Sequence, residues 1–80
     1  MSDEDFAREV GQNVRDARER AGYTQARLSE LTGIAVPHLS RLEAGGHMPS
    51  LKTVKRVADA MGLTVCELMP PKKPRKRGAK

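Results

Sequence analysis

The sequence predicts an all-α fold of five short helices, with a basic tail at the end of the chain. Apolar residues recur at intervals of three and four positions, the spacing of one face of an α-helix. There is one Tyr, one Phe and no Trp, and the apolar residues are mainly Leu, Val, Ala and Met, which favours helix packed on helix. The 80 residues have room for one compact domain, which we place at residues 1–69. Residues 70–80 form the tail.

Glycines separate the first three expected helices. Gly22 follows an apolar stripe of about four turns, which consists of Phe6, Val10, Val14, Ala17 and Ala21. Thr24 is the expected N-cap of the second helix, and Gly33 ends that helix. Pro37 fits only the first turn of the third helix, where its missing N–H has no helical partner to lose. The apolar residues expected to pack between these two helices are Leu28, Leu31, Ile34, Leu39 and Leu42.

Capping residues mark the last two helices. Ser50, after Pro49, opens the fourth helix, and Gly62 closes it. Its expected buried face consists of Leu51, Val54, Val57, Ala58 and Met61. Thr64 and Glu67 have the spacing of a capping box, which predicts a short fifth helix before Pro70.

Positive charge is concentrated at the end of the chain. Six of the 15 Lys and Arg residues lie within residues 72–80, whereas residues 1–71 carry nine basic and ten acidic residues. The tail is basic and almost without apolar residues, so we expect it to be disordered in solution. It could contact DNA phosphates independently of sequence, or bind a partner protein. Because the domain itself is nearly neutral, DNA binding has to be argued from the placement of individual charges.

Several other classes of protein are disfavoured. The single cysteine, Cys66, cannot form an intrachain disulfide, which suits a cytoplasmic location, and we expect it to fill space in the fifth helix. The acidic N-terminus lacks the apolar segment of a signal peptide, and no apolar run is long enough for a membrane span. His38 and His47 have no accompanying cysteine ligands, so we expect no metal site and no cofactor. No catalytic constellation is visible, so we expect no enzyme.

The second and third helices carry the functional signal. They are joined by the tight turn Thr32-Gly33-Ile34, and Gly33 can adopt the left-handed conformation that such a turn needs. This geometry exposes the start and the outer face of the third helix, an arrangement that enters the major groove of DNA.

Together these features resemble a known family. The residues that carry the resemblance are Gly22-Tyr23-Thr24-Gln25, Leu28, Gly33, Leu39-Ser40-Arg41-Leu42-Glu43, Gly45 and Pro49-Ser50-Leu51. In this order and spacing they resemble the Cro/repressor-type (XRE) helix-turn-helix family over about residues 6–69. The resemblance implies a sequence-specific DNA-binding transcriptional regulator of bacterial or phage origin. Such a protein would act as a repressor or autoregulator and bind a palindromic operator as a homodimer.

The resemblance also implies roles for individual residues. Base edges would be contacted by Val36, Pro37, Ser40 and Arg41. Arg41 is the strongest candidate, because a guanidinium can bond O6 and N7 of guanine together, whereas Val36 and Pro37 can only pack on thymine methyl groups or sugars. The DNA backbone would be contacted by Thr24, Gln25, His38, His47 and Lys52. Arg18 and Glu43 would form a partly buried structural ion pair.

Two alternatives remain open. The apolar residues at the end of the domain provide more apolar surface than one short helix needs, so they either form the dimer interface or complete the core. These residues are Met61, Leu63, Val65, Leu68 and Met69. The alternative function is that of an antitoxin or protein-interaction module whose C-terminal tail binds a partner protein.

Overall fold

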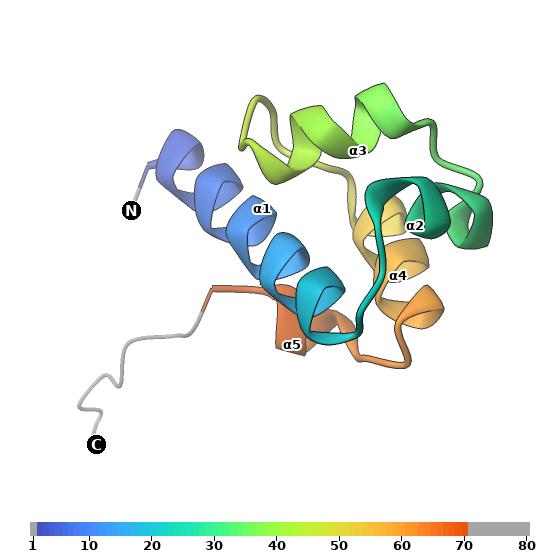
Figure 1. Cartoon of the computed structure of the whole chain (residues 1–80). Coiled ribbons are helices and arrows are strands. Elements are labelled where there is room, and N and C mark those ends of the chain that lie inside the picture. Colours follow the sequence, from blue (N-terminus) through green and yellow to red (C-terminus); the bar gives the residue numbers. More distant parts are fainter. Residues whose placement is uncertain (1, 71–80) are drawn as a thin grey trace, which may run out of the picture.

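The computed structural model describes residues 2–70, which form five helices and no strand. The helices are α1 (Asp3–Arg20), α2 (Gln25–Thr32), α3 (Val36–Glu43), α4 (Leu51–Ala60) and α5 (Val65–Leu68) (Figure 1). The expected all-α class and the order of the five helices are therefore confirmed. The expected tail, from residue 71 onward, lies outside the described residues.

Side-chain caps explain where four of the helices begin. The hydroxyl of the N-cap residue accepts a hydrogen bond from the backbone N–H three positions later, which satisfies one of the free N–H groups of the first turn. The four caps are Ser2, Thr24, Ser50 and Thr64. Glu67 also accepts from the backbone N–H of Thr64, which completes the expected capping box. Only α3 has no side-chain cap, since Ala35 stands at that position.

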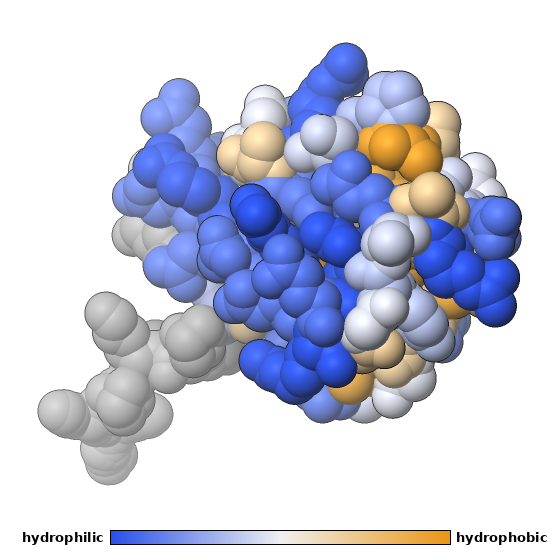
Figure 2. Space-filling view, viewed as in Figure 1, coloured by the Kyte–Doolittle hydropathy of each residue, from blue (hydrophilic) through white to orange (hydrophobic). Residues whose placement is uncertain are grey.

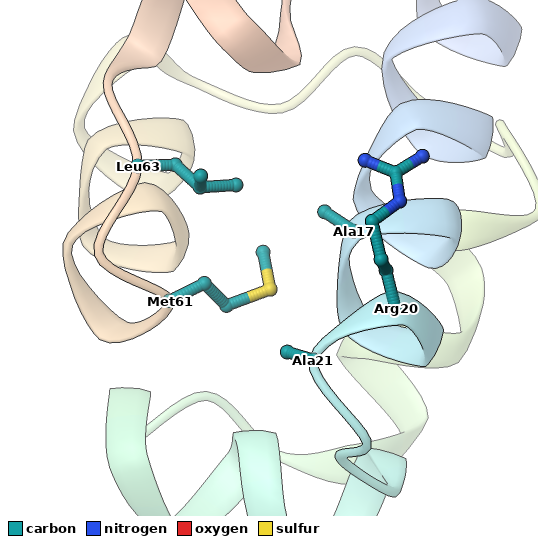
Figure 3. Close-up of a pocket in the computed structure, with 5 residues that line it drawn as sticks. All are labelled: Ala17, Arg20, Ala21, Met61 and Leu63. Carbon is teal, nitrogen blue, oxygen red and sulfur yellow. The ribbon is translucent and has the colours of Figure 1, made fainter.

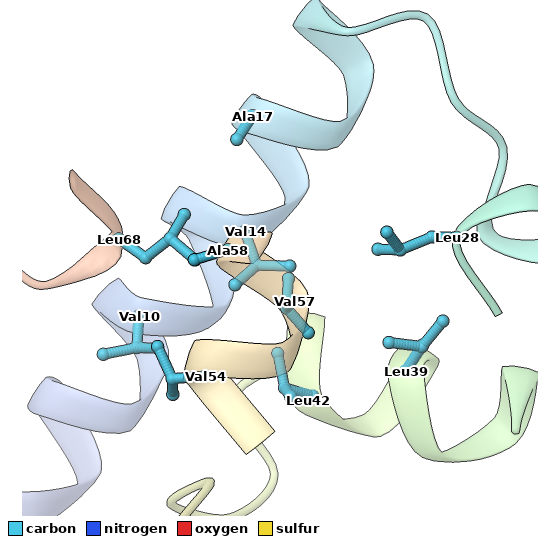
Figure 4. Packing of buried hydrophobic residues seen from close by; sticks show 10 residues of the cluster. All are labelled: Val10, Val14, Ala17, Leu28, Leu39, Leu42, Val54, Val57, Ala58 and Leu68. Carbon is cyan, nitrogen blue, oxygen red and sulfur yellow. The ribbon is translucent and has the colours of Figure 1, made fainter. Parts of the chain in front are cut away.

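The core lies where the five helices meet. α1 packs against α3 and α5, α2 against α3 and α4, and α4 against α5. Figure 4 shows the buried side chains converging between these helices. The core cluster consists of Val10, Val14, Ala17, Leu28, Leu39, Leu42, Val54, Val57, Ala58 and Leu68.

Gly11 sets the separation of α1 and α3. It is buried in the middle of α1, and a Cβ atom there would collide with the carbonyl oxygen of Leu42 and lie 2.8 Å from that of Glu43. The backbones of α1 and α3 can therefore approach closely only because residue 11 has no side chain. The apolar stripe of α1 gave no indication of this contact.

Three positions expected to be buried are exposed. Leu51 is 69% exposed and Leu31 is 41% exposed, and Ala21 is exposed at the end of α1. Leu51 follows the periodicity of α4, but it lies in the first turn, where no helix covers it. In α2 the buried partner of Leu28 is Thr32, whose hydroxyl donates to the Leu28 carbonyl at 2.8 Å and accepts from the Ile34 N–H at 3.1 Å. Thr32 therefore takes the interior position that Leu31 was expected to hold.

Two expectations for the end of the domain also need correction. Leu68 is wholly buried and belongs to the core cluster, so it is unable to contribute to a dimer surface. Cys66 is exposed and does not fill space in α5. The backbone carbonyls of Leu68 and Met69 accept hydrogen bonds from the Asn13 side chain at 3.0 and 3.2 Å, and these bonds fasten the end of α5 to α1. No helix in residues 2–70 is long and apolar enough to cross a bilayer.

Candidate nucleic-acid interface

A sharp turn at Gly33 positions α3 relative to α2. Gly33 has φ +78°, the left-handed region that residues with a side chain rarely adopt, and its N–H donates to the Ser29 carbonyl at 2.8 Å. The buried Thr32 hydroxyl bonds across this turn, as described above. The left-handed conformation predicted for Gly33 is therefore confirmed, and the turn is held by its own hydrogen bonds.

The buried residues of α3 determine which face of the helix is exposed. Leu39, Leu42 and Glu43 face the interior. The opposite face exposes Pro37 and Arg41, four positions apart and hence one above the other on the helix. Ser40 and Ala44 are exposed beside them, and Val36 is 37% exposed at the edge. All four expected base-contacting residues are thus accessible, and the exposed Ala44 borders the same face.

The Arg41 side chain is positioned by the loop that follows α3. Gly45, at φ +77°, and Gly46 close the helix, and the Gly46 N–H donates to the Arg41 carbonyl at 3.0 Å. A Cβ atom at Gly46 would lie 2.9 Å from Cγ of Arg41, so the aliphatic part of the arginine lies directly over this glycine. The absence of a side chain at Gly46 therefore leaves room for the Arg41 side chain, which the sequence alone did not show.

The two histidines come together at one edge of this surface. The ring of His38, on α3, and the ring of His47, in the loop before α4, are 5.3 Å apart in an edge-to-face arrangement with an interplanar angle of 74°. Lys52 is exposed in the first turn of α4. Within residues 2–70, no group of three or more His, Cys, Asp or Glu side chains is placed to hold a metal ion.

The start of α2 combines a cap with a buried network. The Thr24 hydroxyl accepts from the Arg27 N–H at 3.0 Å. The other N–H groups of the first turn of a helix have no intrahelical partner. The side-chain amide of Gln25 donates to Oε1 of Glu43 at 3.0 Å. Gln25, which was expected to contact a phosphate, is therefore also bound to α3 through Glu43.

Glu43 is the centre of this network. Arg18 binds it through two nitrogens, with Nε 2.8 Å from Oε2 and Nη2 3.2 Å from Oε1, and also donates to the Tyr23 carbonyl at 2.8 Å. The side chains of Arg18 and Glu43 are only 11% and 4% exposed. The hydrogen bond to Glu43 raises the pKa of Arg18 above its already high ordinary value. The expected ion pair is thus present, and through Gln25 it links α1, α2 and α3.

Comparison with known proteins identifies the family. A family model described as helix-turn-helix (HTH_3) matches residues 14–68. The chain belongs to this family. The resemblance to XRE-type helix-turn-helix proteins that the sequence suggested is therefore confirmed.

Two relatives in this family are regulators. The chain is 33% identical over 67 residues to an uncharacterised HTH-type transcriptional regulator of Sinorhizobium fredii, covering 84% of this chain and 87% of that protein. It is 32% identical to the immunity repressor protein of Bacillus phage phi105, covering 75% of this chain but only 42% of the repressor.

Solved structures agree on the fold. The restriction-modification controller protein C.AhdI from Aeromonas hydrophila superposes with a TM-score of 0.76 at 27% identity, covering 79% of this chain and 96% of that one. The same fold also forms part of a larger enzyme, the hydroxypropylphosphonic acid epoxidase of S. wedmorenis (TM-score 0.72, 25% identity, 82% of this chain and 35% of that one). The helix-turn-helix fold alone therefore does not decide function, and the surface residues have to carry that argument.

The residues expected to form the dimer interface are divided between two hollows. Met61 and Leu63 line a pocket of about 160 Å³ with Ala17, Arg20 and Ala21 (Figure 3). Met69 instead lines a separate groove of about 180 Å³, together with Phe6, Val10, Met48, Pro49, Leu51 and Val54. Val65 is partly buried and packs against the core. Of the expected interface residues, Met61, Leu63, Val65 and Met69 are therefore partly exposed, and Leu68 is buried.

Proposed function

We propose that this protein is a DNA-binding transcriptional regulator, a repressor or autoregulator, that recognises a palindromic operator as a homodimer. The observation that carries the proposal is the exposed face of α3, on which Arg41 is exposed with the aliphatic part of its side chain over Gly46. A guanidinium placed in this way on an exposed helix can form two hydrogen bonds to one guanine in the major groove. The regulator relatives, one of them a phage repressor, support this assignment.

In this proposal the backbone contacts surround α3. Thr24 and Gln25 bring the start of α2 to a phosphate, where free N–H groups and the positive end of the helix dipole favour an anion. His38, His47 and Lys52 contact the backbone on the other side of the groove. Gln25 would act from a fixed orientation, because its amide is bound to Glu43.

A dimer is proposed because a single α3 can contact only a few base pairs. Two protomers would place their α3 helices in successive major grooves, about 34 Å apart. The partly exposed residues Met61, Leu63, Val65 and Met69 are the proposed contact surface, with Leu68 as the core residue beneath them. A spin label on the exposed Cys66 would test this surface, because a dimer through α5 brings two labels close together whereas a monomer gives no interprotomer distance.

No catalytic role and no cofactor form part of this proposal, and the regulator would work in the cytoplasm. The six basic residues within 72–80 would add affinity without sequence preference, and would contribute roughly −5 to the slope of log K against log salt if all of them contacted DNA.

The test is selection of bound duplexes from a random pool, with the full chain and with the chain ending at Met69. We expect both to enrich the same palindrome. Arg41→Ala should relax specificity at one guanine at a cost of about 1–3 kcal/mol, whereas the matched control Arg15→Ala removes an arginine that pairs with Glu19 on α1 and should leave the site unchanged. If neither chain enriched a site, the proposal would fail, and tight binding of a partner protein through residues 70–80 would favour the antitoxin or interaction module instead.

A further inference from the structure

The surface where α2 meets α3 is apolar. Leu31 is 41% exposed and Val36 is 37% exposed, and Pro37 is exposed beside them. Figure 2 shows a small hydrophobic area over this junction, on a face that is otherwise largely hydrophilic. This apolar area lies at the start of the helix that is proposed to enter the major groove. It would bind DNA favourably only by packing against an apolar group of the DNA.

The backbone at the start of α3 is equally poor in hydrogen-bond donors. Ala35 provides no side-chain cap, Pro37 has no N–H, and the N–H groups of His38 and Leu39 both donate to the Ala35 carbonyl at 2.9 Å. The start of α3 therefore differs from that of α2 and is a poor place for a phosphate. It suits an apolar group on a base edge.

We propose that Val36 and Pro37 recognise the C5-methyl group of a pyrimidine, so that the protein binds thymine and 5-methylcytosine at this position in preference to unmethylated cytosine. The methyl group of thymine is the apolar group that base edges present in the major groove. 5-Methylcytosine carries the same methyl group on the same ring carbon. This inference rests on the proposed DNA-binding function and adds that cytosine methylation would regulate binding.

The helix geometry places this methyl group relative to the guanine. Pro37 and Arg41 are four residues apart on the outer face of α3, which corresponds to about 6 Å along the helix axis. Successive bases of one strand are about 3.4 Å apart. For a helix that lies along the groove, the methylated pyrimidine should therefore be about two base pairs from the guanine that Arg41 contacts.

The experiment uses the selected operator and the full chain, with affinity measured by competition fluorescence anisotropy. Each thymine is replaced in turn by deoxyuridine, which removes only the methyl group. We expect a loss of about fourfold at the position next to Val36 and Pro37 and no change elsewhere, given the usual worth of one buried methyl group. At that position a C·G pair carrying 5-methylcytosine should bind about fourfold more tightly than the same pair with cytosine.

Variants assign the effect to the protein. Val36→Ser and Pro37→Ser change exposed residues, so both should fold, which far-UV circular dichroism checks, and both should reduce the preference for thymine over deoxyuridine. Arg15→Ala should retain the parent ratio. Equal affinity for thymine and deoxyuridine at every position would overturn the inference while the selected site kept the proposed function intact. A preference unchanged in both serine variants would also overturn it, whereas failure to select any site would remove the proposed function itself.

Discussion

The buried ion pair between Arg18 and Glu43 gives the sharpest prediction about stability. Arg18→Met keeps most of the length of the side chain but removes both hydrogen bonds to Glu43 and the bond to the Tyr23 carbonyl. Glu43, 4% exposed, then keeps Gln25 as the one partner left from the network. A buried carboxylate that loses its cation is strongly destabilising, because the interior solvates charge poorly.

The expected loss is about 3–5 kcal/mol. A domain of this size has a free energy of unfolding of roughly 4–10 kcal/mol, so the variant should be near its unfolding threshold. The double variant Arg18→Met, Glu43→Leu removes both charges and should recover much of the loss. The pKa of Arg18 is higher in the folded state than in the unfolded state. Its contribution to the free energy of unfolding is therefore fully present below the unfolded-state pKa and is lost only as pH rises through the folded-state pKa. The arginine should therefore stabilise the fold equally throughout pH 5–9.

Urea denaturation followed by far-UV circular dichroism measures these differences, since the chain has no tryptophan. The matched control is Arg15→Met, which breaks the pair with Glu19 on the same helix, where both side chains are more than half exposed. We expect that change to cost less than about 1 kcal/mol. The reasoning would be refuted if Arg18→Met cost no more than Arg15→Met, or if the double variant were less stable than Arg18→Met alone.

Three further predictions concern the packing and the binding surface. Gly11→Ala should lower the free energy of unfolding by about 1–3 kcal/mol despite the better helix propensity of alanine, because the new Cβ forces α1 away from α3; an unchanged urea midpoint would contradict this. Gly46→Ala should displace the Arg41 side chain and weaken operator binding about tenfold with little change in thermal midpoint, and equal affinity in anisotropy titrations would contradict it. Replacing both His38 and His47 by Ala should weaken operator binding, because both side chains are proposed to contact the DNA backbone, and unchanged affinity in anisotropy titrations would exclude the histidine pair from the interface.

Local signals predicted the helix boundaries well. Gly22, Gly33 and Gly62 end α1, α2 and α4 with positive φ, and the capping residues Thr24 and Thr64 stand where their hydroxyls were expected to act. Such signals depend on a few neighbouring residues, so one sequence is enough to identify them. The tight turn at Gly33 and the apolar residues on either side of it also predicted that α2 packs against α3, which the structure confirms.

Positions that depend on distant neighbours were harder to predict. Leu51 has the periodicity of a core residue, yet no other helix covers it, and Thr32 is buried only because its hydroxyl bonds within the turn. The need for glycine at position 11 is evident only from the carbonyls of α3 that lie against it. In each case hydropathy specifies a face of a helix, but only tertiary packing decides which part of that face is covered.

In the candidate binding surface, too, some features could be predicted from local sequence and others depended on tertiary packing. Exposure of Pro37, Ser40 and Arg41 followed from the periodicity of α3, whereas the support of Arg41 by Gly46 required the path of the following loop. The same holds for Gln25, whose amide is bound by a carboxylate 18 residues further along the chain.

The network around Glu43 connects the stability of the fold to the geometry of the proposed interface. Its carboxylate lies at the end of α3 and holds both Arg18 of α1 and Gln25 at the start of α2. The two helix segments proposed to contact base edges and phosphate are thus fixed to each other through one buried charge. A buried ion pair is a poor source of net stability compared with apolar packing, but its hydrogen bonds require specific directions. In this chain we attribute its value to orientation, because one buried carboxylate joins the start of α2 to the end of α3, and a shift of about 1 Å is enough to misalign hydrogen bonds to a base edge.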